Sequence, residues 1–143
     1  MRIVNGSQFF GKLKKRLQEF PERNSKRACL NSANLVRNTA IQSIARGAAT
    51  GETYVKYNPR RTHTASAPGQ PPASDTGFLI SSISSSVEKH RGSVVGVVRA
   101  SAPYAAHLEF GTQQMAARPF FQPALDRNAT KIKAIFQREG LIK

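Results

Sequence analysis

The chain has 143 residues, one cysteine and a formal net charge of +14. This length suffices for one domain, spanning residues 1–143, that buries a core without metal or disulfide bonds, and a lone cysteine excludes an internal disulfide. No apolar run has the length of a signal peptide or the roughly 20 residues of a membrane span, so we expect a soluble protein made in a reducing cytosol, with no membrane partner.

Positive charge is concentrated in the first part of the chain. Up to Arg61 there are 13 lysines and arginines against three glutamates, so this half carries +10. Such a field attracts polyanions, which makes nucleic acid or an acidic protein the expected partner. The densest run is a candidate contact for DNA or another anion, with a solvated basic face as the open alternative; it comprises Lys12, Lys14, Lys15 and Arg16.

The predicted elements begin with a short amphipathic helix between Ser7 and Phe20. Apolar residues recur there at intervals of three or four, and Pro21 ends or interrupts the helix. We treat residues 1–24 as a basic helical arm. The apolar face of its helix consists of Phe9, Phe10, Leu13, Leu17 and Phe20.

A second, longer helix is predicted from Ser25 to Arg46, with Gly47 as its stop signal. Its apolar stripe also steps by three or four residues, and the alanines on it would let a sheet or another helix approach closely. We interpret the whole stripe as core packing, the cysteine included. It consists of Cys29, Ala33, Val36, Ala40 and Ile44.

Residues 48–76 show no sustained hydrophobic period and contain Asn58-Pro59, Pro68-Gly69 and Pro71-Pro72, which favour turns. We therefore expect a long loop, and such loops in compact domains are usually functional or disordered. We predict that it is poorly ordered in an isolated subunit and orders against a partner. Its aromatic and basic side chains are candidate interface residues, namely Tyr54, Tyr57, Arg60 and Arg61.

An antiparallel hairpin is predicted next. The apolar segment that begins at Phe78 is followed by the polar turn 89–92 and by Ser93–Ala100, which is rich in β-branched residues. After Pro103, the segment Tyr104–Phe110 fits a helix or a strand equally well.

The last predicted element is a C-terminal helix with Pro123 in its first turn and Gly140 at its end. Its apolar side is predicted to consist of Leu125, Ala129, Ile132 and Phe136. The order of elements indicates an α+β domain, in which a long N-terminal helix and a C-terminal helix pack on a small antiparallel sheet.

Patterns typical of catalysis or metal binding are weak. The three histidines and Cys29 are scattered without ligand spacing, and neither a nucleophile turn nor a phosphate-binding loop occurs. His107 and Glu109 would share a face of a strand, but such a pair is more often a structural contact than an acid–base couple. We expect no enzyme, no cofactor and no metal, and keep a hydrolase that uses this pair as a remote alternative.

The segments Tyr104–Thr112 and Arg118–Leu125 resemble the signature of a tail-component family of long-tailed bacteriophages, whose members are small neck or tail-completion proteins. An earlier element, Thr76–Ile83, also resembles the family's Thr-Gly-x-Leu-x-x-Ser-Ile. The chain departs from the family at Ile80, where a basic residue is common, and has a longer insertion at residues 53–64. The matched positions of the main signature are Tyr104, Ala105, Glu109, Phe110, Gly111, Thr112, Ala117, Pro119, Phe120, Pro123, Ala124 and Leu125.

The resemblance implies a structural virion protein at the head–tail junction, made in the host bacterial cytoplasm. Its partners would be further copies of itself in a closed ring of six or twelve subunits, neighbouring neck, tail-terminator or tail-tube proteins, and the DNA that passes through. The alternative is a basic nucleic-acid-binding protein, although no helix-turn-helix, RNA-binding or zinc-finger pattern supports it.

The motif also has a physical interpretation. Glu109 has Arg118 as a candidate partner, either within a subunit or across an interface. Phe120 and Phe121 lie between two prolines, and this apolar pair could anchor the last helix in the core or reach into the next subunit. The candidate interface residues in this part of the chain are Tyr104, Glu109, Phe110, Arg118, Phe120 and Phe121.

Overall fold

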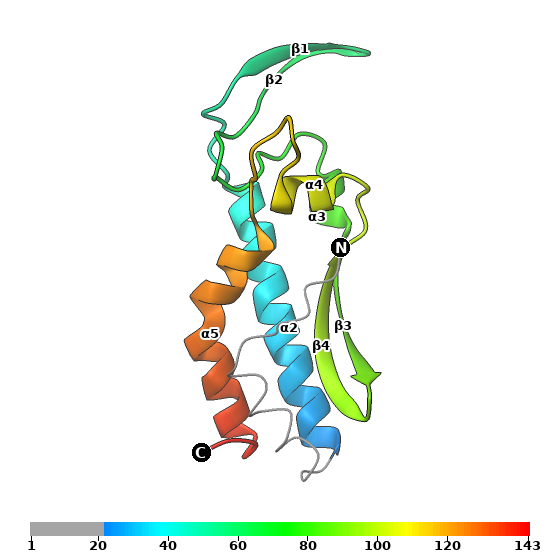
Figure 1. Cartoon of the computed structure of the whole chain (residues 1–143), viewed down its shortest axis with the longest axis vertical. Helices are drawn as coiled ribbons and strands as arrows, with labels where there is room; N and C mark the ends of the chain where they lie inside the picture. The colour runs from blue at the N-terminus through cyan, green and yellow to red at the C-terminus, as the bar shows by residue number, and fades with distance from the viewer. Residues whose placement is uncertain (1–21) are drawn as a thin grey trace.

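The computed structural model describes residues 22–143. The predicted arm helix over residues 7–20, together with Lys12, Lys14, Lys15 and Arg16, lies outside the described residues. Figure 1 shows an elongated molecule with two long helices and two separate hairpins. The elements are α2 (Glu22–Ala45), β1 (Thr53–Tyr57), β2 (Arg60–Thr64), α3 (Phe78–Ser81), β3 (Ile83–His90), β4 (Ser93–Ala100), α4 (Ala105–Phe110) and α5 (Phe121–Arg138).

Helix α2 occupies the middle of the molecule, between the β3–β4 hairpin and α5 (Figure 1). All five residues of its predicted stripe, from Cys29 to Ile44, are buried, so that prediction is confirmed. The sheet approaches α2 closely at Gly96, where an added Cβ would lie 2.6 Å from the backbone oxygen of Cys29. A side chain at position 96 would therefore force the hairpin away from α2.

The predicted hairpin is confirmed as β3–β4, an antiparallel pair with Ile83 opposite Ala100 and His90 opposite Ser93. Arg91 and Gly92 form its turn, and both have positive φ, as the tight turns that match the twist of a hairpin require. The face toward α2 is fixed by a hydrogen bond of 2.6 Å from the Ser85 hydroxyl to Asn34.

Helix α5 packs mainly against α2 rather than directly on the sheet. The predicted apolar side is wrong at Ala129, which is exposed, whereas Asn128 is buried. Asn128 takes the core-facing position because its amide donates to Thr39 Oγ1 at 2.8 Å and to the Ala124 carbonyl at 2.7 Å. A satisfied polar side chain thus lies where the sequence pattern predicted an apolar one.

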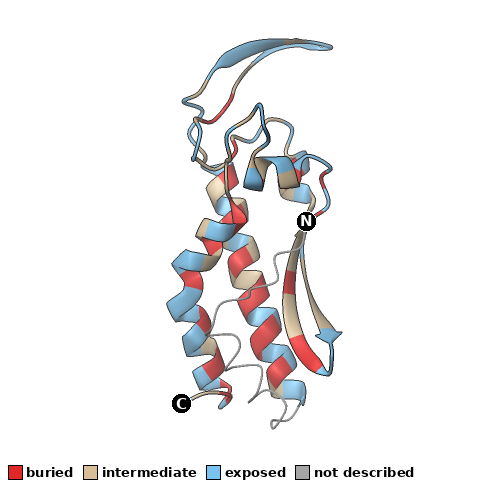
Figure 2. Cartoon of the chain, in the orientation of Figure 1, coloured by how far each residue is buried: buried red, intermediate tan, exposed pale blue. Residues whose placement is uncertain are grey.

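The C-terminal helix α5 ends next to Gly140, as predicted. Gly140 has φ +74°, and the Leu141 N–H donates to the Phe136 carbonyl at 2.9 Å, so the last turn closes and returns a buried leucine to the core. Buried residues recur along α2, β4 and α5 (Figure 2), and they form one core cluster. The α+β class is confirmed.

Two segments contain regular structure that the sequence pattern did not assign. Residues 48–76 contain the β1–β2 hairpin, with Thr53 opposite Thr64, so the prediction of a loop throughout is wrong. None of its strand residues is fully buried and most are exposed (Figure 2), and such strands show no core-facing period. The undecided segment Tyr104–Phe110 is the helix α4, because Ala105 and Glu109, one helical turn apart, are both buried.

Candidate interface at the hairpin end

The β1–β2 hairpin is attached to the rest of the chain through Asp75. The Asp75 carboxylate pairs with Lys56 of β1, with Arg61 of β2 at 3.1 Å and with His63 Nδ1 at 3.6 Å. The hydrogen bond from Lys56 and the charges of Arg61 and His63 hold the pKa of Asp75 below its usual value. One carboxylate therefore gathers three side chains of the hairpin.

Exposed apolar side chains gather at this end of the molecule. Tyr57 is 80% exposed and Phe110 is 70% exposed, and the rings of Phe78 and Tyr104 lie 6.3 Å apart. Among the large hydrophobic residues described as exposed, Leu30 of α2 is the one outside this region. We call the following set the hairpin-end surface: Tyr54, Val55, Tyr57, Phe78, Tyr104 and Phe110.

A groove of about 390 Å³ lies within the hairpin-end surface, and its walls include Tyr54, Phe78 and Tyr104. His63 and Arg118 add basic groups to the same walls. The Nε atom of Arg118 is buried without a hydrogen-bond partner among the described residues. The groove therefore has aromatic rings and basic side chains in its walls.

Glu109 does not pair with Arg118 in the described residues. Its carboxylate, which is buried, accepts three backbone N–H groups at the start of α5: Phe120 at 2.8 Å, Phe121 at 3.0 Å and Gln122 at 2.8 Å. These are the N–H groups that a helix leaves without partners at its N-terminus, and a negative charge there interacts favourably with the positive end of the helix dipole. The motif residue thus joins α4 to α5 within one subunit.

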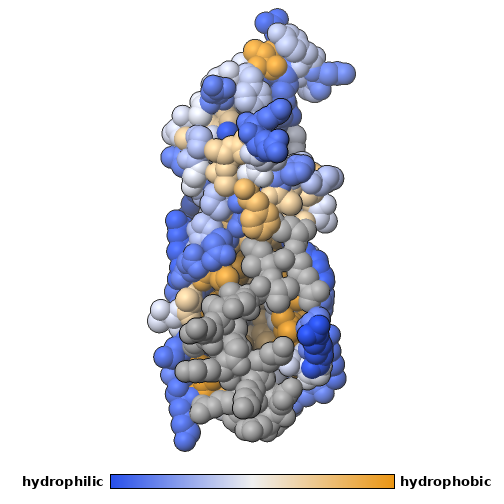
Figure 3. All heavy atoms as spheres, in the orientation of Figure 1, coloured by the Kyte–Doolittle hydropathy of each residue, from blue (hydrophilic) through white to orange (hydrophobic). Residues whose placement is uncertain are grey.

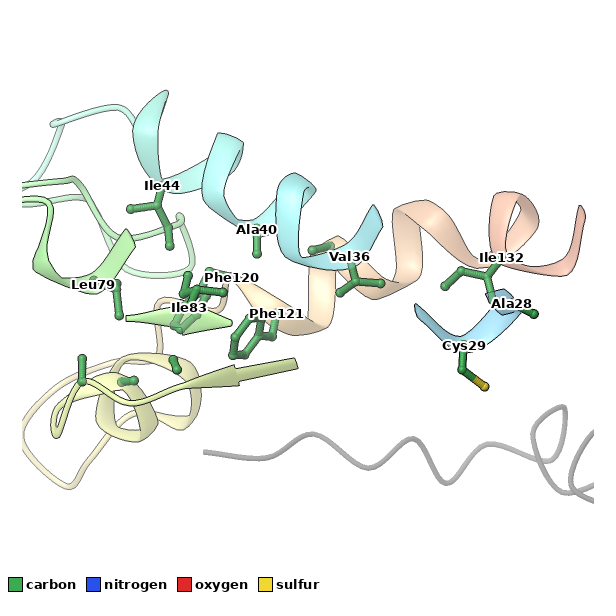
Figure 4. Packing of buried hydrophobic residues seen from close by; sticks show 14 of the residues in the cluster. Ala28, Cys29, Val36, Ala40, Ile44, Leu79, Ile83, Phe120, Phe121 and Ile132 are labelled. Carbon is green, nitrogen blue, oxygen red and sulfur yellow. The ribbon is translucent and has the colours of Figure 1, made fainter. Parts of the chain in front are cut away.

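Phe120 and Phe121 are core residues in this structure. They are 0% and 1% exposed, their rings lie 4.5 Å apart, and Figure 4 shows them in one cluster with Ile83 and Val36. Of the two alternatives for this pair, the structure favours the core anchor for α5. Neither ring is available at the surface of the subunit.

The remaining candidate interface residues come from the segment Tyr104–Phe110 and from the β1–β2 hairpin. Tyr104 and Tyr54 line the same groove although they are 50 positions apart in the sequence, and Phe110 and Tyr57 are exposed at the same end of the molecule. Arg60 lies exposed beside the turn of the hairpin, and Arg61 is held by Asp75. The structure therefore assembles part of the predicted set into one region.

Sequence reasoning missed Phe78, Asp75 and His63. Phe78 was assigned to the apolar segment before β3, but it opens the four-residue helix α3 and is half exposed. The available signal was Gly77, whose φ of +76° reverses the chain immediately before it. No local pattern marked Asp75, because its partners lie 12 to 19 residues earlier.

The described residues offer little for metal or nucleophilic chemistry. Residues 22–143 hold no group of three or more His, Cys, Asp or Glu side chains close enough to bind a metal ion. His107 and Glu109 lie about 200° apart around α4, so the shared face imagined for a strand does not exist. Burial raises the pKa of the Cys29 thiol to about 11, which disfavours the reactive thiolate.

Elsewhere on the surface, hydrogen bonds from Lys26 and Lys89 lower the pKa of Glu22 to about 2.

In the part of the chain that the structure describes, no helix is both long and apolar enough to cross a membrane. Comparison of the chain with protein-family models, with curated proteins and with solved structures finds no match.

Proposed function

We propose that this chain is a non-enzymatic structural protein of a tailed-bacteriophage virion, which forms a ring at the head–tail junction and uses the hairpin-end surface as its contact with a neighbouring subunit. The motif in Tyr104–Leu125 supports the phage assignment through its resemblance to neck and tail-completion proteins. The exposed β1–β2 hairpin is the single structural observation that carries the interface.

A two-stranded hairpin is only marginally stable in water by itself. No other strand or helix of the described chain packs closely against the β1–β2 hairpin, and three of its apolar side chains, Tyr54, Val55 and Tyr57, are exposed. Burying such groups against another protein would stabilise both the hairpin and the complex. Protein interfaces are enriched in the aromatic residues found here.

A ring requires two different surfaces of each subunit to meet repeatedly around an axis. Basic residues outnumber acidic ones by 17 to seven within residues 22–143. Contacts between two basic surfaces of identical subunits would be repulsive. The hairpin-end surface is rich in uncharged aromatic rings, so it suits one side of a contact between copies.

The test compares full-length wild type with the double variant Tyr57→Ser/Phe110→Ser. Both side chains are exposed, so the variant should retain its circular dichroism spectrum and lose ring formation in negative-stain images and incorporation into phage particles. Leu30→Ser is the control, because Leu30 is also apolar and exposed, at 41%, but lies on α2. Rings and infectious particles made equally well by the double variant would contradict the proposal.

A further inference from the structure

Of the acidic residues of the described chain, only Asp126 lies on α5, and several of the others are held in ion pairs elsewhere. Glu22 pairs with Lys26 and Lys89, Glu139 pairs with Arg27, and Asp75 holds the β1–β2 hairpin. Four basic residues on α5 are exposed and form no ion pair with any described residue. They are Arg127, Lys131, Lys133 and Arg138.

Three of these cations lie on one flank of α5. At 100° per residue, Arg127, Lys131 and Arg138 fall within about 40° of one another, whereas Lys133 lies on the other flank. The carboxylate of Asp126 also lies on that other flank, where it accepts a hydrogen bond of 2.9 Å from Gln122. We call Arg127, Lys131 and Arg138 the α5 basic stripe.

The surroundings of the α5 basic stripe distinguish it from a protein-binding surface. None of the large hydrophobic residues described as exposed lies on α5, and the margin of the molecule along α5 is hydrophilic in Figure 3. Protein interfaces have apolar or aromatic centres from which charged residues are depleted. A row of long cations without an apolar centre is instead suited to a polyanion.

We propose that the α5 basic stripe binds the phosphate backbone of double-stranded DNA without reading its sequence. The stripe spans about 16 Å along the helix axis, over which a DNA duplex presents about ten phosphates. Long, flexible Lys and Arg side chains can reach phosphates over that span without a fixed register. This inference goes beyond ring formation, because it concerns a surface remote in the sequence from the hairpin and is measurable on the full chain in any oligomeric state.

The experiment measures binding of a random-sequence 20-base-pair duplex by fluorescence anisotropy at several salt concentrations. Each phosphate contact that releases a counterion contributes about −0.9 to the slope of log Kobs against log salt. The full-length variant Arg127→Gln/Lys131→Gln/Arg138→Gln should therefore show a slope less negative by about 2.7. Glutamine keeps helix propensity close to that of the replaced residues, so α5 should remain folded.

The matched control removes the same number of charges elsewhere, in Arg23→Gln/Arg91→Asn/Lys133→Gln. All three positions are exposed and lie outside any ion pair of the described residues, and Asn tolerates the positive φ of position 91. This control should change the slope much less than the stripe variant does. A further full-length variant with glutamine at Lys12, Lys14, Lys15 and Arg16 measures the share that belongs to the N-terminal arm.

The proposal is supported if the stripe variant loses the expected slope and the control does not. It is overturned if the stripe variant changes the slope no more than the control, or if the arm variant alone abolishes the salt dependence. A stripe variant that binds DNA like the wild type but no longer enters phage particles would show that the stripe contacts an acidic protein, which also overturns the proposal.

Discussion

The body of the molecule and its hairpin end differ in how far their apolar side chains are buried. In the body, formed by α2, β3–β4 and α5, residues such as Ala28, Ala40 and Phe120 are 0% exposed. At the hairpin end, Tyr57 and Phe110 remain largely exposed. Folding of the chain therefore buries most apolar residues of the body and leaves those of the hairpin end exposed, as the proposed interface requires.

This comparison can be tested most strongly by removing one aromatic ring from each region. Phe121→Ala should lower the free energy of unfolding by about 3–5 kcal/mol, because it leaves a cavity in a closely packed core. Tyr57→Ala should change it by less than about 0.5 kcal/mol, as expected for an exposed site. Urea denaturation followed by circular dichroism measures both values, and similar losses in the two variants would contradict the division into regions.

Glu109 tests whether the motif acts within the subunit. Glu109→Gln keeps the size of the side chain but removes its charge and turns an N–H donor toward the N–H groups of residues 120–122. We expect a loss of about 2–4 kcal/mol in the free energy of unfolding, because hydrogen bonds to a buried charged group and the helix dipole are both weakened. A fully stable variant that fails only in assembly would show instead that Glu109 acts across an interface.

Removing the Asp75 carboxylate, which attaches the β1–β2 hairpin, should have the smallest structural effect of these substitutions. This effect should depend on pH. Because the folded-state pKa of Asp75 is lowered, its contribution is present above the ordinary aspartate value near 3.8 and is lost as the pH falls through the lower, folded value. Asp75→Asn should shift the amide NMR signals of residues 53–64 at pH 7 while those of α2 stay unchanged.

At a pH below the folded pKa of Asp75, wild type and Asp75→Asn should give matching hairpin spectra. Asp126→Asn is the control, since this carboxylate is exposed on α5 and contacts Gln122 rather than a cation. If the Asp75→Asn substitution leaves the hairpin NMR signals unchanged at pH 7, Asp75 is not needed to hold the hairpin. The backbone hydrogen bonds between Gly51 and Ala65 and between Ala65 and Glu52 would then suffice.

The sequence predicted those elements whose pattern directly reflects burial. The stripe from Cys29 to Ile44 repeats every three or four residues because one face of α2 is buried, and Val94 to Val98 favour a strand beside a tight turn. Gly140 marked the end of α5 because a positive φ suits glycine. The motif in Tyr104–Leu125 predicted a phage structural role, which stays a prediction.

Only the tertiary structure decided the features that depend on contacts between distant residues. Glu109 binds backbone groups 11 to 13 residues away, Asp75 gathers side chains of an earlier hairpin, and Asn128 enters the core because Thr39 accepts its hydrogen bond. The β1–β2 hairpin escaped prediction because neither of its faces is buried within the subunit, so its sequence carries no period-two pattern. Hydrophobic periodicity records burial along one element, whereas a carboxylate that caps a helix or clamps a hairpin is fixed by where the chain returns in space.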